Sequence, residues 1–313
     1  MRARHWIEYG ALRFGLALFR TLPPRASVGL ARGLAAFWYR LDRRRRETAQ
    51  HNLRQSGIAS TPAEAARLAR ASFVHFGAMF AETLKHDPER PAQRGQVRVV
   101  HDIHPDARAL LEKPGQGLIL VSGHFGNWEI AAQQIGKIKP VAGIAKSMKN
   151  PHADRLVKSV QTRKTFQLIP MHDADAGRFF SVISSGKVLA LLTDQYAKFD
   201  KVMVDFFGVP ASTHASPALL HLVTRAPICF GVCRREGLMQ YRLEVGPPLI
   251  HAPTGNRQAD VRAILENINA RLEQVVREHP EQYLWAHRRW RHVAAPTNQA
   301  QSAQTGGNAR PPR

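Results

Sequence analysis

The chain has 313 residues, of which 44% are hydrophobic and 22% charged. This composition excludes collagen-like, coiled-coil and disordered chains and is typical of one large folded domain or two small ones. Its 45 Lys and Arg residues against 24 Asp and Glu residues give a net charge of +21, which predicts an acidic partner such as nucleic acid, an anionic membrane or an acidic protein. Cys229 and Cys233 are too few for a disulfide framework or a zinc site, and their spacing predicts burial on one face of a strand.

The first 46 residues contain eleven arginines against Glu8 and Asp42. Their first apolar stretch is interrupted by Arg13 and Arg20 and has no small-residue cleavage site, so we expect neither a cleaved signal peptide nor a spanning helix. Two amphipathic helices that lie on an anionic membrane fit better, with the aromatic residues at positions 6, 9, 38 and 39 at headgroup level. The alternative is that both helices simply pack on the domain and leave their arginines in solvent.

The rest of the chain alternates between helical and strand patterns. The predicted helices are 62–85, 127–136, 150–164, 174–186, 215–225 and 258–279. The predicted strands are 117–123, 140–146, 188–194, 227–233 and 240–246. The alternation predicts an α/β fold with a mainly parallel central sheet flanked by helices. In the first of these helices, an apolar stripe from Ala69 to Leu84 is expected to be core.

The domain organisation predicted from these patterns has three parts. They are membrane-associating helices over 1–46, an α/β domain over 47–293, and a disordered tail over 294–313 that is rich in Gln, Gly, Pro and Asn.

The stretch VSGHFGNWEI, residues 121–130, carries the strongest chemical signal. It lies where a buried strand ends and a helix begins, and ligands of open α/β sheets bind at that edge. His124 falls in the turn and Glu129 in the first helical turn, so Glu129 can reach back to the imidazole. A carboxylate on one ring nitrogen fixes the tautomer and leaves the other nitrogen free to accept a proton. The pattern therefore predicts a general base.

The same residues also have structural interpretations. Glu129 is well placed to cap the helix that it begins, and His124 to bond backbone in the turn. Gly123 and Gly126 favour the catalytic interpretation, because paired glycines allow a ligand to approach the backbone closely.

HFGNWE resembles the His-x4-Asp/Glu signature of the late acyltransferases of lipid A biosynthesis. Further segments are similar to motifs of the same family, in order, between residues 6 and 292. They are KNPHADRL (149–156), LLTDQ (191–195), VDFFGVPASTHASPALLHL (204–222) and PEQYLWAHRRWR (280–291). One departure is Lys146, which stands nearest to where family members usually carry an arginine. Lysine lacks the planar guanidinium group that binds phosphate through two parallel hydrogen bonds.

The resemblance implies a glycerolipid-acyltransferase-like fold and an O-acyltransferase that moves an acyl chain from acyl carrier protein to a hydroxyl of a lipid A precursor. It implies action at the cytoplasmic face of the inner membrane, catalysis by His124 as base with Glu129 orienting it, and no metal or cofactor. Acyl carrier protein and the phosphorylated lipid are both acidic, which would account for the charge surplus.

Several further residues are expected to contact substrate. Lys146, Lys149 and Arg155 follow the catalytic turn and are expected to bind phosphate or the carrier, although solvated helix charges are an equal alternative. Asp194 and Gln195 end a strand on the same edge as His124 if the sheet is parallel, and are expected to form a wall of the site. Asn127 is also expected to bind substrate, because it lies within the motif that resembles the family.

The last basic and aromatic cluster consists of Arg288, Arg289, Arg291, Trp285 and Trp290. It is expected either to meet lipid headgroups or to be a packed terminus with its arginines directed outward.

Three other functions compete with this one. The basic segment 40–55 suits a nucleic-acid-binding helix, but no nucleic-acid module is evident, so we expect no nucleic-acid partner. An acyltransferase that uses acyl-CoA on a glycerophospholipid shares the catalytic signature, usually with Asp as the acid. A membrane-binding protein without activity would keep the fold, and the intact His124 and Glu129 argue weakly against it.

Overall fold

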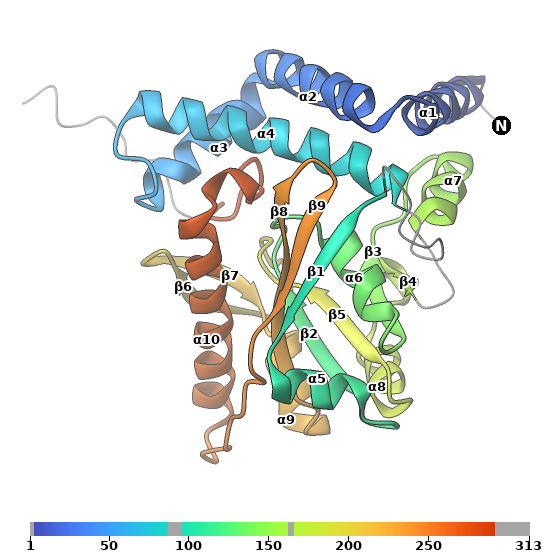
Figure 1. Cartoon of the computed structure of the whole chain (residues 1–313). Coiled ribbons are helices and arrows are strands. Elements are labelled where there is room, and N and C mark those ends of the chain that lie inside the picture. The colour runs from blue at the N-terminus through green and yellow to red at the C-terminus, as the bar shows by residue number, and fades with distance from the viewer. Residues whose placement is uncertain (1–2, 87–95, 162–165, 292–313) are drawn as a thin grey trace, which may run out of the picture.

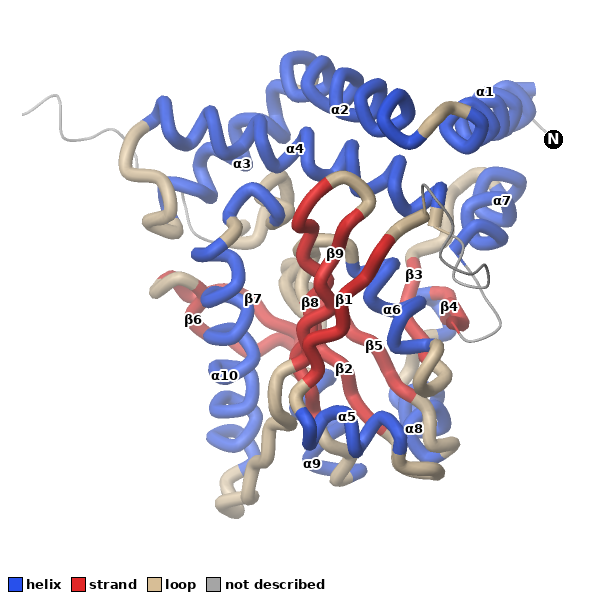
Figure 2. Tube along the Cα trace, in the orientation of Figure 1, coloured by secondary structure: helices blue, strands red, loops and turns tan. Residues whose placement is uncertain are grey.

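The computed structural model describes residues 3–86, 96–161 and 166–291. The helices within these ranges are α1 (Ala3–Thr21), α2 (Pro24–Leu41), α3 (Arg43–Gln55), α4 (Pro62–Lys85), α5 (Pro105–Glu112), α6 (Trp128–Gly136), α7 (Pro151–Gln161), α8 (Ala176–Ser184), α9 (Ser216–Thr224) and α10 (Arg257–Glu278). The strands are β1 (Arg98–Ile103), β2 (Leu118–Ser122), β3 (Val141–Ala145), β4 (Phe166–Pro170), β5 (Val188–Leu192), β6 (Lys201–Phe206), β7 (Val209–His214), β8 (Ile228–Gly237) and β9 (Gln240–Val245). Figure 2 shows a central layer of strands with helices around it and β6 and β7 to one side.

Seven strands form the central sheet in the order β1-β9-β8-β2-β5-β3-β4, and β6 and β7 form a separate hairpin. Every neighbouring pair in the sheet is parallel except β8 and β9, so the predicted mainly parallel α/β fold is confirmed. The apolar run of β2 is buried on both faces, because Ile119 and Val121 enter one hydrophobic cluster while Leu118 and Leu120 enter another.

Helices α1 to α4 form a layer across one end of the sheet (Figure 1). The longest of them, α4, begins with Pro62 after Thr61, whose hydroxyl accepts a hydrogen bond from the Glu64 backbone N–H at 3.1 Å. The hydroxyl of Ser72 donates to the Tyr283 carbonyl at 2.6 Å, which ties the middle of α4 to the C-terminal segment. The His75 imidazole of α4 lies 3.2 Å from the Gly126 carbonyl, so α4 also packs against the turn that follows β2.

The predicted boundary between residues 46 and 47 falls inside α3. The buried apolar residues of that helix, Ala49 and Leu53, belong to the main hydrophobic cluster, so the N-terminal helices and the α/β part are continuous there. The predicted tail, 294–313, lies outside the described residues. None of the described helices has the length and hydrophobicity that a membrane crossing requires.

Two expectations about aromatic residues need correction. Phe80 belongs to the stripe predicted to be core, yet 47% of it is exposed. Tyr39 was expected at headgroup level, but it is buried and its hydroxyl donates to the Ala66 carbonyl at 3.0 Å. Both cysteines are buried and unpaired in one hydrophobic cluster, as predicted.

Candidate active site

The proposed catalytic turn connects β2 to α6 at the carboxyl edge of the sheet. Its last residue, Asn127, caps α6 by accepting a hydrogen bond from the Ile130 backbone N–H at 3.1 Å. The Asn127 amide donates to the Thr83 hydroxyl at 2.9 Å, and the side chain is fully buried. Asn127 was expected to contact substrate; the structure instead gives it the role of fixing the turn.

The two glycines of the turn pack closely against protein, and the expected approach of a ligand to them stays a prediction. Gly126 has a left-handed φ of 58°, and a Cβ there would lie 2.1 Å from the Cys233 carbonyl oxygen. A Cβ on Gly123 would lie 2.8 Å from a methyl carbon of Leu272 on α10. Position 126 therefore requires glycine against the backbone of β8, whereas a side chain at position 123 would have to displace the end of Leu272.

A buried carboxylate holds His124, and it belongs to Asp194. One oxygen of Asp194 lies 2.8 Å from His124 Nδ1, and the other accepts the His124 backbone N–H at 2.8 Å. The sheet explains the pairing, because Ser122 of β2 lies opposite Leu192 of β5 and each of the paired residues follows two positions later. With Nδ1–H donating to Asp194, Nε2 keeps its lone pair and is able to accept a proton.

The sequence reading assigned this position to Glu129, and the structure corrects it. Glu129 lies half-buried in the first turn of α6, while Asp194, expected only as a wall of the site, occupies the orienting position on Nδ1. A catalytic role for Glu129 by another route stays a prediction.

The other face of the imidazole meets one polar and one aromatic group. The Gln195 amide nitrogen lies 3.2 Å from His124 Nε2, where it donates to the lone pair. The Trp128 ring meets the imidazole edge-on with centroids 5.0 Å apart, and Phe76 of α4 lies 5.9 Å from Trp128. A substrate hydroxyl that donates to Nε2 would take the place of the Gln195 amide, beside an aromatic wall.

Asp194 stays ionised despite its burial. Burial would raise the pKa of its carboxyl, but the charge of His124, the two hydrogen bonds to His124 and the nearby Arg289 guanidinium together lower the pKa below its ordinary value. The side chain of Asp194 is 3% exposed and that of His124 is 17% exposed. Solvent therefore reaches the base but scarcely reaches the carboxylate that orients it.

The segment 280–291 is hydrogen-bonded to the turn that carries His124. The Leu284 backbone N–H donates to the His124 carbonyl at 3.0 Å, and the Gly126 N–H donates to the Gln282 carbonyl at 3.0 Å. Tyr283 is buried, and this burial and the negative charge of Asp194 raise the pKa of its phenol. Sequence reasoning placed this segment only by its motif and did not foresee that it holds the turn.

The basic and aromatic cluster at the end of the described chain divides in two. Arg289 is 2% exposed and donates to the carbonyls of Gln195 at 3.1 Å and Ser212 at 2.5 Å. Trp285 and Trp290 are also buried. These residues are thus a packed support of the site, whereas Arg288 and Arg291 are exposed.

The other predicted binding residues lie on the surface. Lys146, Lys149 and Arg155 are exposed around the start of α7. Gln195 lies at the His124 imidazole, as its place at the end of a parallel strand predicted. Substrate contact by the three basic residues stays a prediction.

Comparison with known proteins gives a consistent result. Residues 2–292 match the family model described as bacterial lipid A biosynthesis acyltransferase. The lipid A biosynthesis palmitoleoyltransferase of Escherichia coli (strain K12) is 27% identical over 184 residues, 56% of each chain. The lipid A biosynthesis lauroyltransferase of the same organism is 24% identical over 296 residues, 93% of each chain. The chain thus spans about half the length of the first relative and nearly all of the second.

Solved structures also match, one of them a lipid acyltransferase. The 1-acyl-sn-glycerophosphate acyltransferase of Thermotoga maritima gives a TM-score of 0.34 at 11% identity, over 80% of this chain and 98% of that one.

Proposed function

This chain belongs to the bacterial lipid A biosynthesis acyltransferase family, and from that premise we propose that it transfers a fatty acyl chain from acyl carrier protein to a hydroxyl of a lipid A precursor. The observation that carries the proposal is the His124–Asp194 pair, with Nδ1 held by a buried carboxylate. Such a pair provides the general base that a hydroxyl needs to attack a thioester.

In the proposed reaction the acceptor hydroxyl replaces the Gln195 amide at His124 Nε2. The imidazole takes the hydroxyl proton as the oxygen bonds to the thioester carbonyl carbon. The ionised Asp194 stabilises the imidazolium, and the first turn of α6, beside the imidazole through Trp128, directs the positive end of its helix dipole toward the oxyanion. The carbon–sulfur bond then breaks, and the imidazolium returns its proton to the leaving thiolate.

Aromatic side chains extend from the imidazole toward the N-terminal helices. Trp128 contacts Phe76, Phe80 follows one turn later on α4, and Phe19 of α1 meets Phe80 edge-on with centroids 6.0 Å apart. We propose that the acyl chain lies along this track, because an alkyl chain gains about 0.8 kcal/mol for each methylene that leaves water.

A donor comparison tests the proposed function. Purified protein is incubated with a lipid A precursor and either acyl carrier protein or coenzyme A carrying the same acyl chain, and the product is identified by mass spectrometry. We expect transfer from the carrier at a kcat/KM at least about tenfold above that from acyl-CoA, because a basic surface speeds encounter with an acidic carrier. Equal use of both donors would contradict the preference for the carrier. If a lysoglycerophospholipid were acylated in the same assay and the lipid A precursor were not, the protein would be a glycerophospholipid acyltransferase instead.

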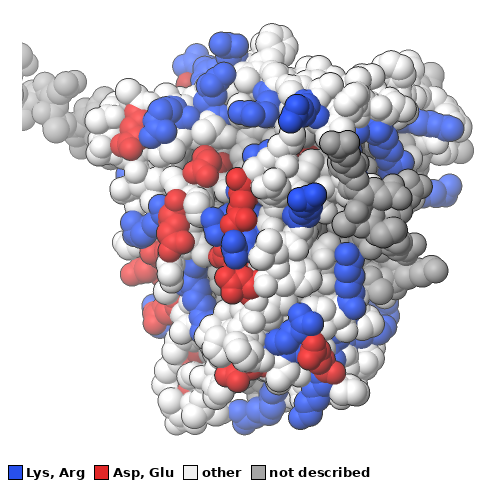
Figure 3. Space-filling model, in the orientation of Figure 1, with Lys and Arg blue, Asp and Glu red and all other residues white. Residues whose placement is uncertain are grey.

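The N-terminal helices suit attachment to an anionic membrane surface. Large apolar side chains are exposed on both, and they include Ile7 (72%) and Phe14 (70%) on α1 and Leu34 (52%) and Phe37 (56%) on α2. Figure 3 shows Lys and Arg side chains frequent over the upper part of the molecule, where α1 to α4 run. We therefore propose that the enzyme lies on the cytoplasmic face of the inner membrane through α1 and α2.

Removing exposed aromatic groups from this face is expected to weaken membrane binding. The double substitution Phe14→Ser and Phe37→Ser should reduce sedimentation with phosphatidylglycerol vesicles by about tenfold or more, since each buried Phe contributes about 1.5–3 kcal/mol. The matched control is Phe199→Ser with Ile250→Ser, two side chains that are 80% and 88% exposed outside these helices. Equal binding of both double variants would show that α1 and α2 do not carry the attachment.

A further inference from the structure

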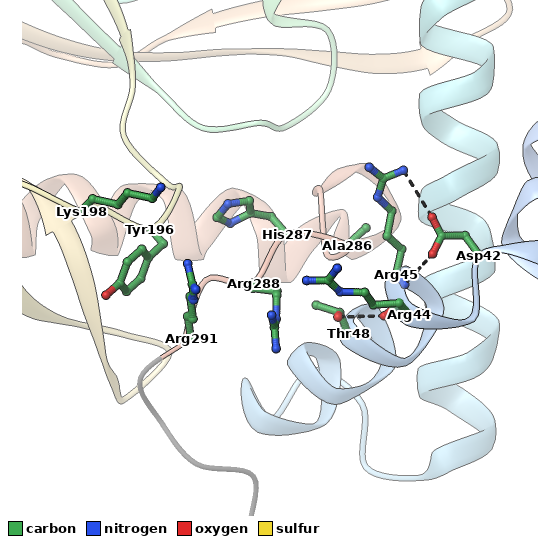
Figure 4. A pocket seen from close by; sticks show the side chains of 10 residues that line it. All are labelled: Asp42, Arg44, Arg45, Thr48, Tyr196, Lys198, Ala286, His287, Arg288 and Arg291. Carbon is green, nitrogen blue, oxygen red and sulfur yellow. Dashed lines mark hydrogen bonds and ion pairs between the residues drawn. The ribbon is translucent and has the colours of Figure 1, made fainter. Parts of the chain in front are cut away.

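A cavity of about 600 Å³ lies between the start of α3, the segment after β5 and the C-terminal turn. Its charged lining residues are Arg44, Arg45, Lys198, Arg288, Arg291 and Asp42. We call it the basic cavity, because five cations line it against a single carboxylate. Figure 4 shows that these side chains come from the start of α3, from the segment after β5 and from the C-terminal turn.

Buried hydrogen bonds fix the three walls of the basic cavity to one another. The Asn52 amide of α3 donates to the carbonyls of Trp285 at 2.8 Å and His287 at 2.7 Å, which joins α3 to the C-terminal turn. Arg289 donates to the Gln195 carbonyl at 3.1 Å and so joins that turn to the segment after β5. Asn52 and Arg289 are 4% and 2% exposed, so the cavity is formed before any ligand binds.

Two lining residues connect the basic cavity with the surroundings of His124. Tyr196 lines it, and the preceding residue, Gln195, donates to His124 Nε2. His287 also lines it; burial lowers the pKa of its imidazole, and the charges of Asp194 and His124 act on it as well. A molecule bound by an anionic group in the cavity can therefore present a neighbouring hydroxyl to His124.

The surplus of cations is available to a ligand. Asp42 forms an ion pair with Arg45 at 3.3 Å, which leaves Arg44, Lys198, Arg288 and Arg291 without a carboxylate partner among the described residues that line the cavity. The Arg291 guanidinium lies 6.0 Å from the centre of the Tyr196 ring, and both side chains line the cavity. Arginine forks bind the oxygens of a phosphate monoester in pairs.

The position of the basic cavity points to a lipid headgroup. Leu41 ends α2 and is 59% exposed, and the next residue, Asp42, lines the cavity. A lipid whose chains stay in the bilayer beneath α2 would place its headgroup there. We propose that the basic cavity binds the phosphate of a phosphorylated sugar headgroup of the acceptor lipid, an inference that rests on the proposed function and locates its acceptor.

Titration calorimetry with glucosamine 1-phosphate tests the site without acyl transfer. We expect Arg288→Ala with Arg291→Ala to weaken its binding by at least about tenfold, because charge-assisted hydrogen bonds are lost. Arg178→Ala with Arg257→Ala removes the same charge from exposed positions outside the cavity and should change binding by less than about twofold. Unchanged binding in the cavity variant, or equal binding of glucosamine without phosphate, would overturn the proposal.

Steady-state kinetics of the same variants show whether the bound phosphate belongs to the acceptor lipid or to the acyl donor. The cavity variant should raise the KM for a phosphorylated lipid A precursor by at least about tenfold and leave the KM for the acyl donor within about twofold. A rise in the donor KM alone would assign the cavity to the phosphate of the donor and contradict the proposal. If no variant and no wild-type protein acylates the precursor while calorimetry behaves as expected, the proposed function fails and the phosphate site stands.

Discussion

Asp194→Asn should lower kcat for acyl transfer by about 10²- to 10⁴-fold. The carboxylate uses both oxygens, one for Nδ1–H and one for the backbone N–H of His124. An amide offers a single oxygen, so one of these two donors would face an NH₂ group. The amide also carries no charge to stabilise the imidazolium that forms when His124 takes the hydroxyl proton.

A second buried pair provides a matched control. His251 and Asp260 lie 2.9 Å apart, and their side chains are 17% and 3% exposed, the same fractions as His124 and Asp194. Asp260 is in the first turn of α10 and outside the proposed site. Asp260→Asn should therefore cost stability while it leaves kcat of the folded enzyme within about twofold. Equal losses of kcat in the two variants would mean that Asp194 acts only on folding.

The lowered pKa of Asp194 adds an expectation about pH. A carboxylate with a depressed pKa contributes stability that is present above its unfolded pKa and is lost as pH falls through the folded one. Asp194 thus remains ionised across the neutral and mildly acidic range. Protonation of Asp194 should therefore make no contribution to any change of kcat between about pH 5 and 7, and a pH–rate profile of the wild-type enzyme checks this.

The sequence made much of this fold predictable because its signals were local. The run at 117–123 is apolar at every buried position, and β2 is covered on both faces. Residues 62–85 combine a capping threonine, a first-turn proline and a helical spacing, and α4 has the predicted limits. These features are decided by neighbours within a few positions, so a single sequence reveals them.

Elements with mixed patterns escaped prediction. β1 is largely exposed at an edge of the sheet and carries no apolar alternation. β4 occupies the other edge and ends in Pro170. The hairpin of β6 and β7 turns through Phe207 and Gly208, both with a left-handed φ. Of these two residues only the glycine is typical of such a turn, so the sequence gives a weak signal for it.

The partner of His124 depended on strand order, which the sequence does not display. Between β2 and β5 the chain passes through α6, β3, α7, β4 and α8, yet β5 lies directly beside β2. Glu129, five residues away, was the nearer candidate in sequence. Asp194, seventy positions along the chain, is the nearer group in space because the register aligns the two strand ends.

His124→Ala should lower kcat by about 10²- to 10⁴-fold, because the group that accepts the hydroxyl proton is gone. The loss should persist at saturating concentrations of both substrates, since the imidazole acts on the attack and not on binding. His251→Ala, which removes the other imidazole of equal exposure, should keep nearly full kcat. A His124→Ala enzyme of normal rate would require a different base.

Mass spectrometry of lipid A tests the central claim most directly. Cells of the source organism that lack this protein are supplied with the wild-type chain or with His124→Ala at equal levels of folded protein. We predict that the wild-type chain restores one secondary acyl chain and that His124→Ala leaves lipid A lighter by that chain. Restoration of the chain by His124→Ala, or no difference between cells with and without the protein, would contradict the account.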